Sequence, residues 1–175
     1  MSSSKINVMV DIETLDTERT AAILSIGACT MAPFTDTLTF YEEIMAVGQE
    51  ARTQSQSTLD WWKTQSNYPD GGIRNLPAVL TSFSRYISSL RAEPIIWCKG
   101  TEFDTAILSH AYKQLGMEVP WKYSAVRDFR TMKKLFPCSP PYPANPTAHH
   151  ALADALHQSA ELREMTKQYS FVLES

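Results

Sequence analysis

The chain has 175 residues, 43% of them hydrophobic and 20% charged, and its formal net charge is −3. This length and composition are typical of a globular protein, so we expect a single domain over residues 1–175 with its core between about residues 6 and 167. The slightly acidic balance excludes a wholly basic nucleic-acid coat but permits a local basic patch. Three cysteines and four histidines do not combine at the spacing of a zinc finger or a disulfide framework.

The N-terminal segment Met1–Ile6 lacks the long apolar core of a secretory signal. No apolar run in the sequence approaches the length of a transmembrane helix. We therefore expect a cytoplasmic protein without a membrane partner, located in the host cytoplasm if the chain is encoded by a phage.

The first part of the chain is rich in short apolar runs. Such runs, with β-branched residues, predict strands at residues 6–10, 21–31 and 37–45. The polar segment 11–20 between the first two is expected to be a loop. Three consecutive strands favour an antiparallel meander, and a short helix is expected next, over residues 57–65.

The remainder alternates helix and strand patterns. Apolar residues from Leu76 to Leu90 recur at spacings of four and three, which predicts an amphipathic helix. The following elements are expected at 94–98 (strand), 104–115 (helix), 129–135 (short helix) and about 149–166 (helix). Five of the ten prolines fall between Pro137 and Pro146, which predicts a loop. The whole order predicts a mixed α/β sheet flanked by helices.

Four acidic residues stand near the ends of predicted elements. Asp11 and Glu13 directly follow the first strand and, at positions i and i+2, would point to the same face. Asp104 opens a helix, and Asp154 lies among small and apolar residues of the last helix. Each has a plain structural explanation as a solvated strand end, a helix cap or a single polar position on a helix. Together they suit a site for hard divalent cations, which would relieve the repulsion between the carboxylates.

Two histidines precede the last acid and are candidate general bases, because histidine titrates near neutral pH. In an ideal helix His150 would share a face with Asp154, four residues later, whereas His149 would point away. The proline-rich loop before them can release His149 from helical geometry, so both remain candidates on geometry alone.

The motifs, taken in order, resemble the DEDDh class of 3′→5′ exonucleases. The resemblance rests on Asp11-Ile-Glu-Thr, Phe103-Asp104 and His149-x4-Asp154-Ala, and extends from about residue 6 to 165. Ile26-Gly27-Ala28 and Trp61-Trp62 are similar to the small bacterial and phage branch of this class. The resemblance implies a ribonuclease-H-like fold with three antiparallel strands followed by parallel strands. It also implies 3′→5′ hydrolysis of single-stranded DNA or RNA to nucleoside 5′-monophosphates.

The resemblance further implies a role for each site residue. Asp11, Glu13, Asp104 and Asp154 would hold two Mg²⁺ or Mn²⁺ ions, one to activate water and one to stabilise the leaving 3′ oxygen. The family spacing selects His149 as general base and gives His150 a position that is often basic in relatives. Thr14 and Leu15 would meet the 3′-terminal nucleotide, with Leu15 packing on its base. Some relatives dimerise, so a homodimer is compatible with the resemblance.

Several features have two readings. Trp61 and Trp62 could stack on bases or pack in the core, and neighbouring helical residues face different ways, so at most one is expected to be free. Basic residues between Lys122 and Lys134 could line a phosphate path or form a solvated face, and Asp128 among them could be an outer-shell acid. The alternative function is a catalytically silent nucleic-acid-binding module on the same fold. A serine or cysteine hydrolase is disfavoured because no G-x-S-x-G motif occurs.

Overall fold

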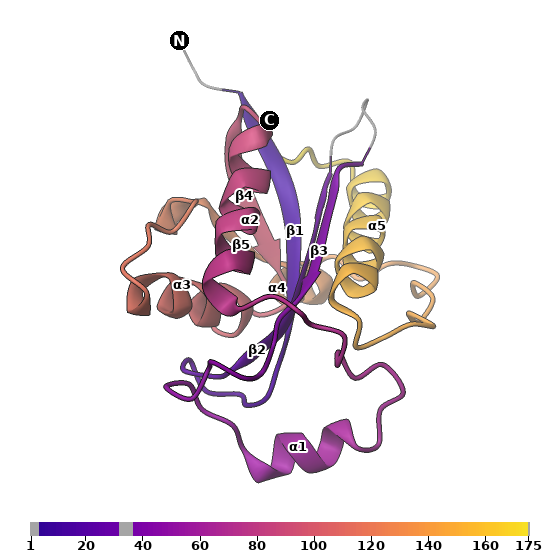
Figure 1. Ribbon diagram of the computed structural model, residues 1–175. Helices are drawn as coiled ribbons and strands as arrows, with labels where there is room; N and C mark the ends of the chain where they lie inside the picture. Colours follow the sequence, from indigo (N-terminus) through magenta and orange to yellow (C-terminus); the bar gives the residue numbers. More distant parts are fainter. Residues whose placement is uncertain (1–3, 32–36, 175) are drawn as a thin grey trace.

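The computed structural model describes residues 4–31 and 37–174, which form one mixed sheet covered by helices (Figure 1). The described strands are β1 (Lys5–Thr14), β2 (Ile23–Thr30), β3 (Thr39–Glu43), β4 (Glu93–Cys98) and β5 (Val126–Asp128). Their order in the sheet is β3-β2-β1-β4-β5. The pairs β1–β2 and β2–β3 are antiparallel, whereas β1–β4 and β4–β5 are parallel. The fold class predicted from the sequence is confirmed.

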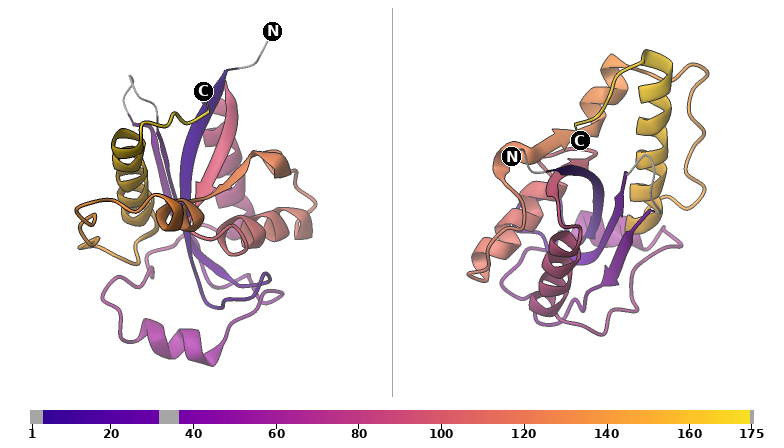
Figure 2. Two further views of the ribbon diagram at one scale, coloured as in Figure 1. Left: turned by 180° about the vertical axis from the view of Figure 1, so that it is seen from behind. Right: turned by 90° about the horizontal axis from the view of Figure 1, so that it is seen from above.

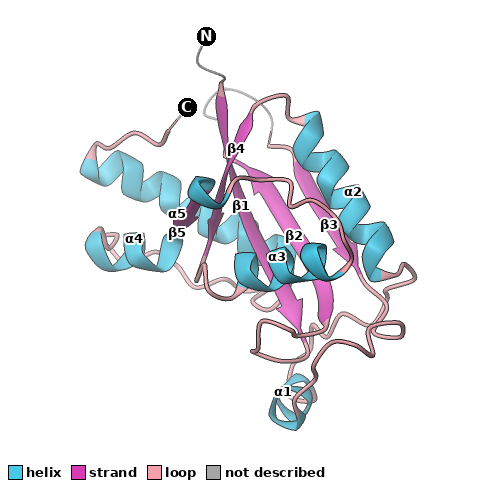
Figure 3. Cartoon of the chain, turned by 90° about the vertical axis from the view of Figure 1, so that its left-hand side faces the viewer, coloured by secondary structure: helices cyan, strands magenta, loops and turns pink. Residues whose placement is uncertain are grey.

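Helices cover both faces of the sheet (Figure 2). They are α1 (Gln56–Trp62), α2 (Leu76–Ser89), α3 (Asp104–Gln114), α4 (Phe129–Leu135) and α5 (Ala151–Tyr169), with a 3₁₀ turn at Tyr123–Ala125. Helices α2 and α3 pack on one face and α4 and α5 on the other. Helix α1 lies beyond one end of the sheet (Figure 3). Within the described ranges, no helix combines the length and the apolar character that a membrane crossing requires.

The alternation of side chains along β1 divides the core into two parts. Val8 and Val10 face α2 and α3 in the larger core, whereas Met9 faces the core formed with α4 and α5. Because side chains alternate along a strand, Asp11 and Glu13 continue the row of Met9. The acids therefore lie on the α5 side of the sheet.

The first strand is longer than predicted. Residues 11–14 are not a loop but the end of β1, because they pair with β2, with Asp11 opposite Gly27 and Glu13 opposite Ser25. Strand β5 was not among the elements predicted from the sequence, although a strand end near Asp128 was considered. This strand has three residues, including Arg127 and Asp128, and has no apolar pattern of its own. It forms by pairing with β4.

The last helix begins later than predicted. It starts at Ala151 rather than His149, because His149 has a left-handed backbone with φ 65° and His150 is the N-cap. The N–H of Ala153 donates to Nδ1 of His150 at 3.3 Å, in the manner of a helix cap. The proline-rich segment before it forms the predicted loop. The histidines are thus presented from a loop and a cap, outside the regular helix.

Candidate active site

Four acidic side chains from three elements converge near the end of β1. Oxygen atoms of Asp11, Glu13 and Asp154 lie within 4.8 Å of one another. Asp104, at the start of α3, joins the group through the strand, since its Oδ1 accepts a hydrogen bond of 3.1 Å from the N–H of Ile12. Ile12 is the residue between Asp11 and Glu13. The structure therefore brings together all four acids that the sequence singled out.

The acids are crowded and largely shielded from water. Burial, and then the neighbouring acids, raise the pKa of Asp11 well above its ordinary value. Burial followed by Asp154 and Asp104 raises the pKa of Glu13 to about 8, and burial raises the pKa of Asp104 to about 7. Glu13 is only 8% exposed. These shifts reflect first the burial of the carboxylates and then, at Asp11 and Glu13, repulsion from neighbouring acids; an added positive charge would favour the ionised forms.

The protein supplies little positive charge of its own here. Within residues 4–31 and 37–174, none of the four acids forms a salt bridge with lysine or arginine. The charges of Arg130 and Lys99 favour the ionised form of Asp104, but only from a distance. A set of clustered carboxylate oxygens is the ligand set that Mg²⁺ and Mn²⁺ prefer. The residues present therefore fit divalent cations.

Besides the N–H of Ile12 at Asp104, uncharged N–H groups hold Asp11 and Asp154 in place. The Nε2 of Gln158 donates to Oδ1 of Asp11 at 2.8 Å. The Nδ2 of Asn145 donates to Oδ1 of Asp154 at 3.0 Å, and the backbone N–H groups of His149 and His150 donate to its Oδ2 at 2.6 and 3.3 Å. Sequence reasoning missed both amides. Gln158 had one signal, since it follows Asp154 by one helical turn and shares its face.

A glycine allows α5 to approach the sheet at the site. Gly27 lies opposite Asp11 on β2. A Cβ atom at Gly27 would lie 2.2 Å from the backbone C of Ala151 and from the backbone N of Leu152. Only glycine permits this contact between a strand and the first turn of the helix. The contact sets the distance between β1–β2 and Asp154.

The two histidines occupy different environments. The ring of His149 is exposed and meets Trp61 edge-on, with centroids 4.7 Å apart. The Nδ2 of Asn67, in the segment that follows α1, donates to the carbonyl of Ala148 at 2.9 Å. This hydrogen bond holds the loop residue that precedes His149. The ring of His150 stacks on Tyr41, with centroids 4.4 Å apart, while its Nδ1 caps α5.

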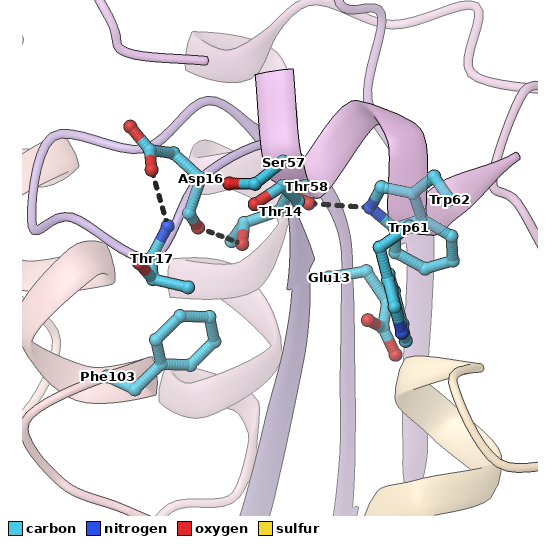
Figure 4. A pocket seen from close by; sticks show the side chains of 9 residues that line it. All are labelled: Glu13, Thr14, Asp16, Thr17, Ser57, Thr58, Trp61, Trp62 and Phe103. Carbon is cyan, nitrogen blue, oxygen red and sulfur yellow. Dashed lines mark hydrogen bonds between the residues drawn. The ribbon is translucent and has the colours of Figure 1, made fainter. Parts of the chain in front are cut away.

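A cavity of about 320 Å³ opens beside Glu13, between the end of β1 and α1 (Figure 4). Its lining consists of Glu13, Thr14, Asp16, Thr17, Ser57, Thr58, Trp61, Trp62 and Phe103. Trp61 is 39% exposed, whereas Trp62 is 3% exposed and its Nε1 donates to the carbonyl of Thr14 at 2.8 Å. Only one of the two tryptophans is thus free, as expected.

Leu15 differs from its expected role. Its side chain is 2% exposed and packs with Ala22, Leu24 and Trp62 in a small core beneath α1. In this arrangement Leu15 offers no surface to a base, because its side chain is buried in this small core. Thr14, its neighbour, does line the cavity.

The basic segment is largely committed to ion pairs. Lys122 pairs with Glu93 at 2.8 Å, Lys133 with Glu161 at 2.9 Å, and Arg127 with Glu174. Asp128 caps α4 and also accepts the N–H of Thr101, so both of its oxygens bind backbone groups. These contacts support the reading of a paired and solvated face over that of a phosphate path. They likewise give Asp128 a structural role.

Comparison with known proteins identifies the class of this fold. The family profile described as "3'-5' exoribonuclease Rv2179c-like domain" matches residues 6–166. No curated protein matches the chain. The nuclease domain of 3'hExo, a DEDDh family member bound to rAMP, superposes with a TM-score of 0.61 and 12% identity, covering 97% of this chain and 96% of that one.

Exonuclease I of E. coli has the same fold. The zinc-bound form of its complex with single-stranded DNA superposes with a TM-score of 0.65 and 14% identity, covering 95% of this chain and 41% of that one. Its complex with a dT13 oligonucleotide superposes with a TM-score of 0.66 and 12% identity, covering 94% of this chain and 41% of that one. The chain thus spans about two-fifths of the exonuclease I chain. At these identities the likeness establishes the ribonuclease-H-like exonuclease fold.

Proposed function

Because the chain belongs to the family of 3′-5′ exoribonuclease Rv2179c-like domains, we propose that it is a metal-dependent exonuclease acting on single-stranded nucleic acid. It removes nucleoside 5′-monophosphates one at a time from the 3′ end. The observation that carries this proposal is the group of Asp11, Glu13 and Asp154 with oxygens within 4.8 Å, adjoined by Asp104. Divalent cations held by such a group would suit phosphodiester hydrolysis, because they would offset the negative charge that builds up on the phosphate oxygens and on the leaving oxygen.

Two divalent cations, Mg²⁺ or Mn²⁺, would be held by Asp11, Glu13, Asp104 and Asp154. When bound, they would supply an activated water and stabilise the charge on the leaving 3′ oxygen. The contribution of the protein is to keep the carboxylates close and fixed before the cations bind. The raised pKa values of Asp11, Glu13 and Asp104 mean that cations and protons compete for this site.

His149 is the proposed general base, which takes the proton of the attacking water. Its imidazole is exposed and caps no helix. His150 is less suited, because its Nδ1 accepts the N–H of Ala153 and so the neutral ring carries its proton on Nε2.

The 3′-terminal nucleotide is proposed to enter the cavity beside Glu13. Trp61 and Phe103 flank this cavity and offer aromatic surfaces for a base (Figure 4). Thr14, Ser57 and Thr58 provide hydroxyl groups in its wall. The description of the family names an exoribonuclease, whereas the solved structures of exonuclease I hold single-stranded DNA and dT13. We therefore propose RNA as the first substrate and DNA as the comparison.

The test uses 5′-labelled single-stranded RNA and DNA of one sequence, incubated with Mn²⁺ and resolved on a sequencing gel over time. A descending ladder is expected, with RNA the faster substrate, and EDTA should stop the reaction. Asp11→Asn provides the matched inactive control. Intact oligonucleotides that are nevertheless retarded in a gel shift would overturn the proposal in favour of a catalytically silent binding module. Cleavage that survives EDTA would refute the dependence on metal.

A further inference from the structure

Gln158 is a polar side chain at a position that suits an apolar one. It lies on α5, is 4% exposed, and the helix buries Ala155 and Leu162 on the same side. Its Oε1 is buried and accepts no hydrogen bond from any residue in 4–31 or 37–174. A buried acceptor without a partner and an ordered flexible side chain both cost free energy. The stability of the fold therefore does not account for a glutamine here.

The other end of the same amide explains its presence. Nε2 of Gln158 donates to Oδ1 of Asp11 at 2.8 Å. No other described side chain donates to the carboxylate of Asp11. Since Gln158 follows Asp154 by one helical turn, α5 supplies both an acid of the site and the group that orients an acid on β1.

The chemistry of the donor matters as well as its position. Lysine or arginine at this place would also orient Asp11, but would add a positive charge that competes with a cation. An amide donates a hydrogen bond and leaves the charge of the carboxylate available. The same choice recurs at two of the other acids, where Asn145 donates to Asp154 and the backbone of Ile12 donates to Asp104. Groups of this kind orient metal ligands in proteins.

We propose that Gln158 is a positioning residue of the metal site, whose amide holds the carboxylate of Asp11 in the orientation that receives a divalent cation. The inference rests on the proposed function for the nature of the ligand. Loss of the amide leaves the carboxylate of Asp11 free to rotate. Such losses weaken metal binding by about 10- to 100-fold. Stability should change little, because the unpaired Oε1 disappears with the amide.

The experiment measures Mn²⁺ binding by isothermal titration calorimetry without nucleic acid, so that it does not depend on turnover. Gln158→Met keeps the length of the side chain and removes the donor. Ser159→Ala is the matched control, since Ser159 is the adjacent buried polar residue on α5 and hydrogen-bonds with Cys29 instead of an acid. We expect Gln158→Met to bind Mn²⁺ at least 10-fold more weakly than wild type or Ser159→Ala. Its melting temperature in EDTA should be no lower than that of the control.

A second variant separates loss of the hydrogen bond to Asp11 from an effect of altered packing. Gln158→Asn keeps the amide but is too short to reach Asp11, so it should also lose affinity for Mn²⁺. During turnover, either variant should raise the Mn²⁺ concentration for half-maximal rate more than it lowers kcat at saturating Mn²⁺. Wild-type affinity in both folded variants would overturn the inference and leave the proposed function intact. Absence of Mn²⁺ binding by the wild-type protein would instead refute the metal site itself.

Discussion

The contact between Gly27 and α5 offers a direct test of how the fold positions the site. A Cβ atom at Gly27 would lie 2.2 Å from backbone atoms of Ala151 and Leu152, whereas ordinary contacts begin at 3.4 Å. The carbonyl oxygen of Ala151 would lie at 2.5 Å. These neighbours are backbone atoms and cannot rotate away. In Gly27→Ala, the first turn of α5 must therefore move from the sheet by about 1 Å.

That displacement has a predictable effect on the site. Asp154 lies in the first turn of α5 and would move with it. Metal sites tolerate ligand displacements of only about 0.2 Å, and a displacement of about 1 Å in an active site can cost about 100-fold in rate. Overpacking at this contact should also cost about 1–3 kcal/mol of stability. We expect Gly27→Ala to fold, to melt several degrees lower and to lose about 100-fold in activity.

Gly116→Ala is the matched control. Gly116 has φ +66° and no neighbour within 4 Å of a Cβ, so alanine there strains the backbone by about 1–2 kcal/mol without moving α5. The assay compares initial rates on a 5′-labelled oligonucleotide at a temperature well below both melting points, together with Mn²⁺ affinity. If Gly27→Ala retains the wild-type rate, or if both variants lose activity equally, the close approach does not set the position of Asp154 and the reasoning fails.

Three further predictions concern the acids and histidines. Asp154→Asn should abolish cleavage on the gel while circular dichroism stays unchanged, because asparagine can still accept the N–H of His149; turnover near the wild-type rate would refute the site. His149→Ala should lower kcat by about 10²–10⁴-fold, whereas His150→Ala should chiefly cost about 1 kcal/mol of stability through the lost cap, and the reverse pattern would reassign the base. For Glu13, the pKa in the folded state is about 8, above the ordinary 4.5. As pH rises, the carboxyl therefore loses its proton at a lower pH in the unfolded chain than in the folded protein. The free energy of unfolding in EDTA should accordingly fall as pH rises from 4.5 to 8. Glu13→Gln removes this loss and should melt above wild type at pH 8.5 in EDTA; a variant no more stable there would contradict the assignment.

Local patterns in the sequence determined much of this protein. The spacing of Asp11 and Glu13 placed them on one face of a strand, because that geometry depends only on the alternation of side chains. The apolar period from Leu76 likewise identified α2, and the run of prolines identified a loop. The four acids could be selected because their motifs are short, ordered and near the ends of elements. Each of these inferences uses residues that are close together in the chain.

Contacts between distant segments decided the rest. β1 extends to Thr14, and β5 exists, only because each strand pairs with a neighbour. The hydrogen bond from Gln158 to Asp11 joins residues 147 positions apart, and no local pattern indicates such a bond. The same holds for the burial of Leu15 beneath α1 and for the ion pairs that occupy the basic segment. The sequence by itself thus indicated which acids gather at the end of β1, whereas only tertiary packing decided which groups hold Asp11, Asp104 and Asp154 in place.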